Sequence, residues 1–238
     1  LAELTRIEPD LLIVSPGYRP DHPLTTYADN SGIPVWGDIQ LAWRLRDKTD
    51  RIADWICVTG TNGKTTTSQL TAHMLVAGGV KAAPVGNIGT PVLDAFRDTE
   101  GFDALVVELS SFQLHRLGNI SPYAAVVLNI ADDHLDGHGG REAYEQAKGH
   151  VYENVQVACV YNRADRVTEE LVEQADVIEG ARAISFGLDP PPPSGLGVIE
   201  NLLIDRSFHA ERFTSALELL SLEELEANAL RAPHLIED

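Results

Sequence analysis

The sequence predicts an α/β protein with a mostly parallel sheet that helices cover on both faces. From residue 55 onward, strand-like apolar runs alternate with helix-like segments, which is typical of a parallel sheet. The run Ala104–Leu109 (ALVVEL) is almost continuously apolar, as expected of a strand buried on both faces. A tight glycine-containing loop at 60–64 joins one predicted strand directly to a helix.

The first part of the chain predicts a partial N-terminal Rossmann-like unit, spanning residues 1–50. Residues 10–15 (DLLIVS) form a short buried strand that ends at Pro16-Gly17, and residues 34–36 form a second extended segment. Asp38 can cap a helix that runs through Leu41 and Leu45.

Residues 51–230 predict one central domain. Strands are expected at 56–59, 80–85, 104–109, 124–130 and 155–161, and helices at 65–77, 141–154 and 165–174. Leu70, Met74 and Ala77 share one face of the first helix, which Gly78-Gly79 ends. Short strands at 183–186, 198–200 and 202–205 predict a small antiparallel edge, with the prolines 190–193 as a stiff loop.

Composition excludes some functions. The formal net charge of −18 argues against nucleic acid, because no basic stripe can neutralise phosphates. No apolar run approaches the roughly 20 residues that span a bilayer, so no membrane insertion is expected. Cys57 and Cys159 lie in strand-like runs and are expected to be free buried thiols of a cytoplasmic protein. Because the net negative charge repels anions, an anionic ligand must be held by a local group of hydrogen-bond donors.

Residues 58–66 (VTGTNGKTT) predict such a local site for a nucleotide. Glycines let the backbone aim N–H groups at an anion, and the following helix adds its positive end. Lys64 would reach the β- and γ-phosphates of ATP, and the Thr65 hydroxyl would bind Mg²⁺. Val58 stands where the longer form of the motif has glycine, so the spacing is a shorter G-x-x-G-K-T. The alternative is a plain glycine-rich turn between strand and helix. Such a turn gives no structural reason for Lys-Thr directly after its last glycine, at the start of a helix.

Two further strand ends carry reactive residues, at 108–113 and 129–136. In open α/β sheets ligands bind beyond the carboxyl ends of the strands. Burial of Glu108 would be costly without a partner, and a metal ion is one such partner. Alone, Glu108 could equally serve in a cap or ion pair, and His134 could be an ordinary loop residue. Beside a phosphate loop, the two favour a Mg²⁺ site.

The helix predicted at 141–154 places a lysine in its apolar stripe. The residues that share this face are Tyr144, Ala147, Lys148, Val151 and Tyr152. The ordinary interpretation is a lysine that extends from the edge of the core toward water. Burial of an ammonium group favours the neutral amine, which can react with CO₂ to form a carbamate. A carbamate on Lys148 would supply an anionic oxygen ligand near the metal.

The motifs together resemble the Mur ligase family. The matching segments, in family order, are 59–65 (TGTNGKT), 86–89 (GNIG), 108–114 (ELSSFQL), 133–136 (DHLD) and 147–148 (AK). Folylpolyglutamate synthetases are relatives that share the phosphate loop. The segments ELSSFQL and GNIG, with the N-terminal DLLIVSPG and VWGDIQL, point to the branch that adds D-glutamate. The resemblance covers roughly residues 10–205.

The resemblance implies roles for individual residues. ATP would be held by Gly60, Thr61, Asn62, Gly63, Lys64, Thr65 and Thr66, with Asn228 on the adenine side. Of two Mg²⁺ ions, one would be bound by Thr65 and Glu108, and the other by His134 and a carbamylated Lys148. The residues facing the nucleotide-sugar substrate would be Asn87, Ser110 and Gln113, with Ser15 and Gly17 near its uridine diphosphate. Lys64, His134 and Lys148 are the implied catalytic residues. Leu235 departs from the family's Pro-His-Arg pattern, and residues 231–238 would begin the link to a further domain.

The implied reaction is the ATP-driven addition of D-glutamate to UDP-N-acetylmuramoyl-L-alanine through an acyl phosphate, by a monomer. Two alternatives stay open: a folylpolyglutamate-type ligase, and a nucleotide-binding module without catalysis.

Overall fold

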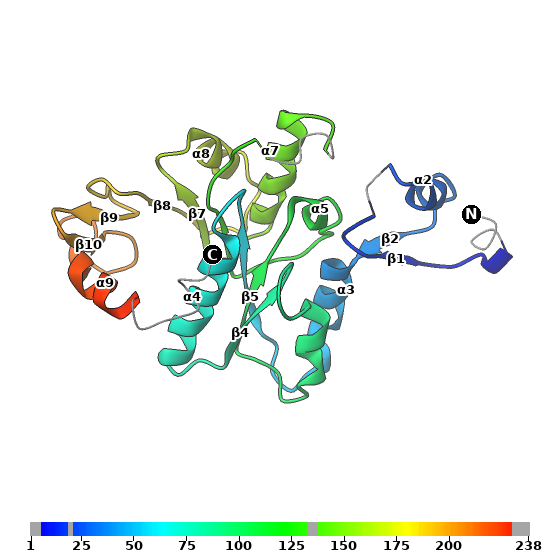
Figure 1. Cartoon of the computed structure of the whole chain (residues 1–238), viewed down its shortest axis with the longest axis horizontal. Coiled ribbons are helices and arrows are strands. Elements are labelled where there is room, and N and C mark those ends of the chain that lie inside the picture. Colours follow the sequence, from blue (N-terminus) through cyan, green and yellow to red (C-terminus); the bar gives the residue numbers. More distant parts are fainter. Residues whose placement is uncertain (1–5, 19–20, 133–137, 230–238) are drawn as a thin grey trace.

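The computed structural model describes residues 6–18, 21–132 and 138–229. Within these residues, nine strands form one sheet in the order β11-β10-β9-β8-β7-β6-β3-β5-β4 (Figure 1). Its strands are β3 (Asp54–Thr59), β4 (Ala82–Gly86), β5 (Ala104–Glu108), β6 (Ala124–Val127), β7 (Ala158–Asn162), β8 (Arg182–Phe186), β9 (Gly195–Ile199), β10 (Leu202–Asp205) and β11 (Leu217–Ser221).

The sheet is parallel from β4 to β9 and antiparallel only where β10 pairs with β9 and β11. The predicted mostly parallel sheet with a small antiparallel edge is therefore confirmed. Two details differ from the prediction. Strand β8 belongs to the parallel part, and β11 was not predicted at all.

The direction of each crossover decides which face a helix covers. The chain passes from β3 over β5 to β4 through α4 (Lys64–Ala77), and from β6 to β7 through α7 (Arg141–Gly149) in the opposite direction along the sheet. Because such crossovers are right-handed, the two helices lie on opposite faces. The chain also leaves β3 and β5 in opposite directions along the sheet, toward β4 and toward β6. The loops that follow these two strands therefore separate and leave a crevice at their carboxyl ends.

The larger core lies on the face covered by α7. Besides α7, this face carries α3 (Asp38–Leu45), η2 (Val92–Arg97), α5 (Ser111–Leu114), η3 (His150–Tyr152) and α8 (Arg166–Glu173). Trp55, Tyr144 and Tyr152 are its largest buried side chains. The Tyr152 hydroxyl accepts from the Val127 N–H at 3.0 Å and donates to the Val160 carbonyl at 2.6 Å, so its burial leaves no polar group unpaired.

Helix α4 covers the other face with small side chains. Ser68 and Ala72 are buried against the sheet, whereas Met74 is 57% exposed and Leu70 and Ala77 are also exposed. The predicted apolar face of this helix was therefore wrong. Small residues let the helix lie close to Val58 and Val106, and of its larger side chains Leu75 packs partly buried against them whereas Met74 points away.

The N-terminal unit lies beyond α3, at the right of Figure 1. Strands β1 (Leu12–Val14) and β2 (Val35–Gly37) pair in parallel and are joined by α2 (Pro23–Asn30), which was not predicted. The predicted cap at Asp38 was wrong, because Gly37 is the N-cap and makes no side-chain cap bond. The Asp38 carboxylate instead accepts from Gln113 Nε2 at 2.9 Å, which ties this unit to α5.

The remaining elements are the short η1 (Arg46–Lys48) after α3 and the helix α9 (Leu222–Ala229) after β11. The helix predicted at 141–154 is α-helical only to Gly149, and η3 follows it. In the part of the chain that the structure describes, no helix is both long and apolar enough to cross a membrane.

Candidate active site

A pocket of about 270 Å³ lies in the crevice at the carboxyl ends of β3, β4 and β5. Six residues predicted for the site line it: Gly17, Gly60, Lys64, Asn87, Ser110 and Lys148. They come from the N-terminal unit, the phosphate loop, the β4 and β5 ends and α7. The lining also includes Ser111, Phe112 and Tyr144, which the sequence reasoning did not propose as site residues. Segments that are distant in sequence therefore converge on one cavity.

The phosphate loop is held open by glycine geometry and by bonds to the segment after β6. Gly60 has φ +149° and Gly63 has φ +83°, conformations that other residues adopt only with strain. The Asn62 N–H donates to Asn129 Oδ1 at 2.9 Å, and Asn129 Nδ2 donates to the Asn62 carbonyl at 3.0 Å. The Thr61 N–H donates to the Asn129 carbonyl at 3.0 Å. The loop keeps its shape through these contacts.

Lys64 folds back over this loop from the first turn of α4. Its Nζ donates to the carbonyls of Gly60 at 3.0 Å and Thr61 at 2.9 Å. The ammonium group therefore lies at the mouth of the loop, beside the N-terminus of a helix, where an anion is favoured. Thr65 and Thr66 follow it in the same turn.

Lys148 approaches the same loop from α7. Only 2% of this residue is exposed, which confirms its predicted place in the apolar stripe. Its Nζ donates to the Gly60 carbonyl at 2.9 Å and lies 4.8 Å from the centre of the Tyr144 ring. Tyr144 in turn bonds Thr61 Oγ1 through its hydroxyl at 3.0 Å. Two lysines thus share one carbonyl oxygen of the phosphate loop.

Glu108 ends β5 as a buried carboxylate that is 2% exposed. One of its oxygens accepts from Asn87 Nδ2 at 3.2 Å, and its carbonyl accepts from the Asn87 N–H at 2.9 Å. Glu108 does not line the pocket, but Asn87 does. An oxygen donor of this kind, with its carboxylate partly engaged by an amide, suits a hard cation such as Mg²⁺.

Ser110 and Gln113 form a capping box at the start of α5. The Ser110 hydroxyl accepts from the Gln113 N–H at 3.2 Å, and Gln113 Oε1 accepts from the Ser110 N–H at 3.0 Å. Ser110 lines the pocket, whereas Gln113 is buried, with its amide nitrogen on Asp38. Ser15 is exposed next to Pro16, which does line the pocket.

A histidine network beside the pocket was missed in the sequence. His138, which is 8% exposed, bonds Ser111 Oγ through Nε2 at 2.9 Å and His115 Nε2 through Nδ1 at 2.7 Å. No spacing pattern connects positions 115 and 138, because they meet only through the fold. Burial lowers the pKa of His115, and the nearby charges of His150 and Arg116 lower it further.

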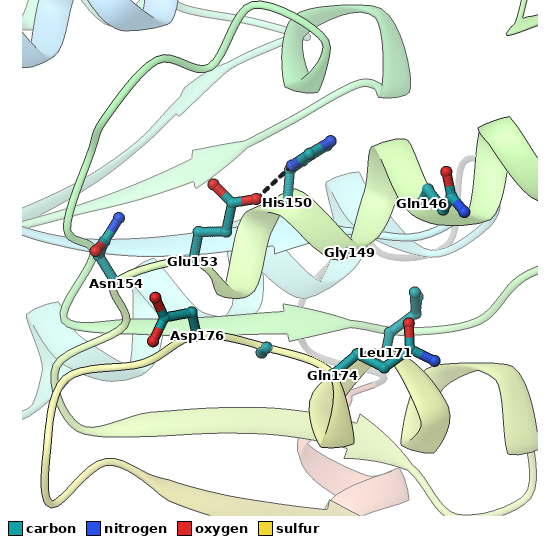
Figure 2. A pocket seen from close by; sticks show the side chains of 9 residues that line it. Gln146, Gly149, His150, Glu153, Asn154, Leu171, Gln174 and Asp176 are labelled. Carbon is teal, nitrogen blue, oxygen red and sulfur yellow. Dashed lines mark hydrogen bonds and ion pairs between the residues drawn. The ribbon is translucent and has the colours of Figure 1, made fainter.

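Several predicted residues cannot be placed in this pocket. His134, with the rest of the matching segment 133–136, and Leu235 lie outside the described residues. Asn228 belongs to α9, which follows β11 at the far edge of the sheet. A larger cavity of about 460 Å³ lies between α7, η3 and α8 (Figure 2). None of the predicted site residues lines it; its polar groups include His150 and Glu153, which contact each other at 2.5 Å.

The family model for the Mur ligase middle domain matches residues 58–219, and the chain belongs to the Mur ligase family. A relative from Leifsonia xyli subsp. xyli, a UDP-N-acetylmuramoylalanine--D-glutamate ligase, is 62% identical over 98% of this chain and 47% of its own length. A relative of the same name from Streptomyces avermitilis is 51% identical over 95% of this chain and 50% of its own length. The chain therefore spans about half the length of the curated relatives it matches.

The fold is also similar to a solved structure of UDP-N-acetylmuramoyl-L-alanyl-D-glutamate--2,6-diaminopimelate ligase. The TM-score is 0.59 at 20% identity, over 96% of this chain and 57% of the other. At this identity the likeness concerns the fold alone.

Proposed function

We propose that this chain forms the ATP-binding and much of the muramoyl-substrate-binding part of a ligase that joins D-glutamate to UDP-N-acetylmuramoyl-L-alanine. The observation that carries the proposal is the single pocket shared by Lys64, Asn87, Ser110 and Lys148, in a chain 62% identical to a ligase of that name. A pocket that joins a phosphate loop to the N-terminal unit suits a reaction between ATP and a second substrate.

The reaction proceeds by phosphoryl transfer and then amide formation. A carboxylate oxygen of the muramoyl substrate attacks the γ-phosphorus of ATP, and the bond to the β-phosphate oxygen breaks to release ADP. The D-glutamate nitrogen then attacks the acyl carbon, and the electrons of the C–O bond leave with phosphate. The protein contributes chiefly by positioning the two substrates and by stabilising the charge that develops.

Lys64 leaves the loop carbonyls to contact the β- and γ-phosphates in this proposal. The amides of residues 60–66 line the phosphates, and the N-terminus of α4 adds its positive end. Asn228 contacts the adenine side, and Gly17, Ser15, Asn87, Ser110 and Gln113 serve the nucleotide-sugar substrate.

Glu108 and Thr65 would hold one Mg²⁺, and His134 and Lys148 a second. Bound Mg²⁺ would neutralise charge on the transferred phosphoryl group. The buried Glu108 carboxylate fits a hard cation, because its charge otherwise has only the Asn87 amide among the contacts described above.

A carbamate on Lys148 is the form proposed for the active protein. The ammonium group of Lys148 loses a proton, the nitrogen of the neutral amine bonds to the carbon of CO₂, and a second proton leaves the nitrogen to give the carbamate. Support comes from the burial of Lys148 at the pocket. Electron density for three extra atoms on Nζ, in crystals grown with bicarbonate, would test this. Clear density for a bare amine under those conditions would contradict it.

The activity is tested on the whole gene product that carries this sequence, with ATP, MgCl₂, UDP-N-acetylmuramoyl-L-alanine and isotope-labelled D-glutamate. ADP and the labelled product are expected in equal amounts, and only when all components are present. ADP release with a folate acceptor instead would favour the folylpolyglutamate-type alternative. ATP binding with no ADP release under any condition would favour a module without catalysis.

Lys64→Ala separates the phosphate-loop role from general stability. The variant is expected to lose ADP formation by about 100- to 1,000-fold or more, because a positioned cation at the transferred phosphate is lost. Its thermal unfolding should be close to that of the wild type. Lys48→Ala, which removes a lysine that is largely exposed beside Asp47, is the matched control and should leave ADP formation unchanged. Normal turnover by Lys64→Ala would refute the assigned role.

A further inference from the structure

The histidine network beside the pocket can order its hydrogen bonds in two directions, and the direction decides what it offers to a ligand. Its three members are Ser111, the first residue of α5, His115, which follows α5, and His138, which precedes α7. Ser111 is buried and lines the pocket together with Lys64. The network therefore reaches from an exposed histidine to the pocket wall.

Aromatic contacts hold the His138 ring in one orientation. It stacks on Phe112 at a centroid distance of 4.8 Å and an interplanar angle of 20°, and the ring of its hydrogen-bonded partner His115 lies 17° from its plane with the centroids 4.8 Å apart. The Tyr144 ring meets it edge-on at 5.2 Å. A ring packed by Phe112 on one face and by Tyr144 edge-on keeps its two nitrogens in fixed directions, toward His115 and toward Ser111.

One hydrogen lies between the two histidine rings, so the network has two possible directions. Partial desolvation, with the nearby charges of His150 and Arg116, lowers the pKa of His115 below its ordinary value, which favours the neutral ring. If His115 donates to His138 Nδ1, then His138 Nε2 donates to Ser111, and the Ser111 hydroxyl hydrogen is available to a ligand. In the reverse direction, Ser111 donates to His138 and offers only lone pairs.

The pocket favours the first direction. Lys64 lines the same cavity, and an ammonium group there selects a ligand oxygen that carries negative charge. Such an oxygen needs a donor. We propose that Ser111 donates its hydroxyl hydrogen to a phosphate or carboxylate oxygen of the substrate in this pocket, with His138 as the positioning residue that sets the direction. This inference rests on the proposed function, because it assumes that the pocket binds the muramoyl substrate.

Three variants of the whole gene product test the inference through the KM for UDP-N-acetylmuramoyl-L-alanine and through kcat. Ser111→Ala removes the donor and should raise this KM by about 10-fold, since a hydrogen bond to a charged group is lost. His138→Phe keeps the stacked ring without nitrogens and should raise KM to a similar extent. His138→Gln keeps an amide N–H within reach of Ser111 and should return KM to within about 3-fold of the wild type.

The double variant distinguishes alignment from general damage. If His138 acts through Ser111, Ser111→Ala with His138→Phe should be no worse than Ser111→Ala alone. His73→Phe is the matched control: this histidine is exposed on α4, and its replacement should change neither constant. Thermal unfolding of each variant shows whether it is folded.

The outcomes separate this inference from the proposed function. Wild-type turnover with an unchanged KM in Ser111→Ala would overturn the inference alone. Fully additive losses in the double variant, or no rescue by His138→Gln, would overturn the positioning role of His138. A wild-type protein that neither binds nor converts the muramoyl substrate would overturn the proposed function and this inference with it.

Discussion

The partly buried Asp38 carboxyl joins the N-terminal unit to α5 through Gln113, and its burial destabilises the charged form. Burial raises its pKa above the ordinary value of 3.8, and the hydrogen bond from Gln113 opposes that shift only in part. The folded state therefore holds this proton more tightly than the unfolded state does. The stabilising contribution is fully present below the ordinary pKa and is lost as pH rises through the raised pKa.

Asp38→Asn should remove this pH dependence. The asparagine oxygen can still accept from Gln113 Nε2, while the cost of a half-buried charge disappears. At neutral pH we expect the variant to equal or exceed the wild type in unfolding free energy, by up to about 1 kcal/mol. Urea titrations at neutral and mildly acidic pH measure the difference. A variant less stable than the wild type at neutral pH would show that the carboxylate charge is itself favourable.

At the residue scale, the sequence predicted burial well where one charged residue stood out from apolar surroundings. Lys148 in an apolar stripe and Glu108 at the end of an apolar strand are both buried, as their patterns indicated. His138 and Ser111 gave no such signal, because their contact depends on how α5 packs against α7. The Gln113 side-chain amide donates to the Asp38 carboxylate, a contact between distant parts of the sequence that no local pattern could reveal.

At the scale of elements, the junction of β4 and β5 depends on a glycine. Gly86 pairs with Glu108 and has φ +122°, and a Cβ there would lie 2.2 Å from the Glu108 carbonyl oxygen. Gly86→Ala should therefore destabilise the fold by about 2 kcal/mol or more, through both backbone strain and the steric clash. Denaturant unfolding provides the measurement.

Gly79→Ala is the matched control for that change. Gly79 also has a positive φ, +86°, but nothing lies within 4 Å of an added Cβ. Its replacement should cost only the conformational term of about 1 kcal/mol. Equal losses of unfolding free energy in the two variants would mean that the backbone near Glu108 moves away from the added Cβ without destabilising the fold.

Elements with weak local patterns were the ones that the sequence did not reveal. Helix α2 has few apolar residues to set a period, and α5 is only four residues long. Strand β11 (LELLS) is rich in leucine and glutamate, which favour helices, and it runs directly into α9. The buried face of α4 could not be found by hydrophobicity, because its contact residues Ser68 and Ala72 are small.

At the scale of the whole molecule, the two cysteines report on the integrity of the core. Cys57 and Cys159 belong to the same buried cluster, and burial raises the pKa of each to about 12. Thiolate is the reactive form, so both should resist iodoacetamide at about pH 8 in the native protein and react fully in denaturant. Mass spectrometry counts the labels. Rapid labelling under native conditions would show that the core opens locally.

The architecture was the most predictable feature, since it follows from alternation and handedness rather than from any one contact. Apolar runs placed the parallel strands within a few residues, and the crossover rule accounts for α4 and α7 lying on opposite faces. The N-terminal unit could not be placed from sequence, because its attachment relies on side-chain bonds such as that of Arg116 to Asp29 at 3.5 Å.

The shared Gly60 carbonyl has a consequence for how the loop receives a phosphate. Lys64 and Lys148 both donate to it, so in the proposed function, in which Lys64 turns to an anion, the oxygen keeps Lys148 as a donor, since a carbamate nitrogen still carries one N–H. No water has to enter and no peptide has to rotate to compensate for the departing bond. Lys64 is then the side chain that moves and Lys148 the one that stays, so the loop can bind and release a phosphate with its backbone unchanged.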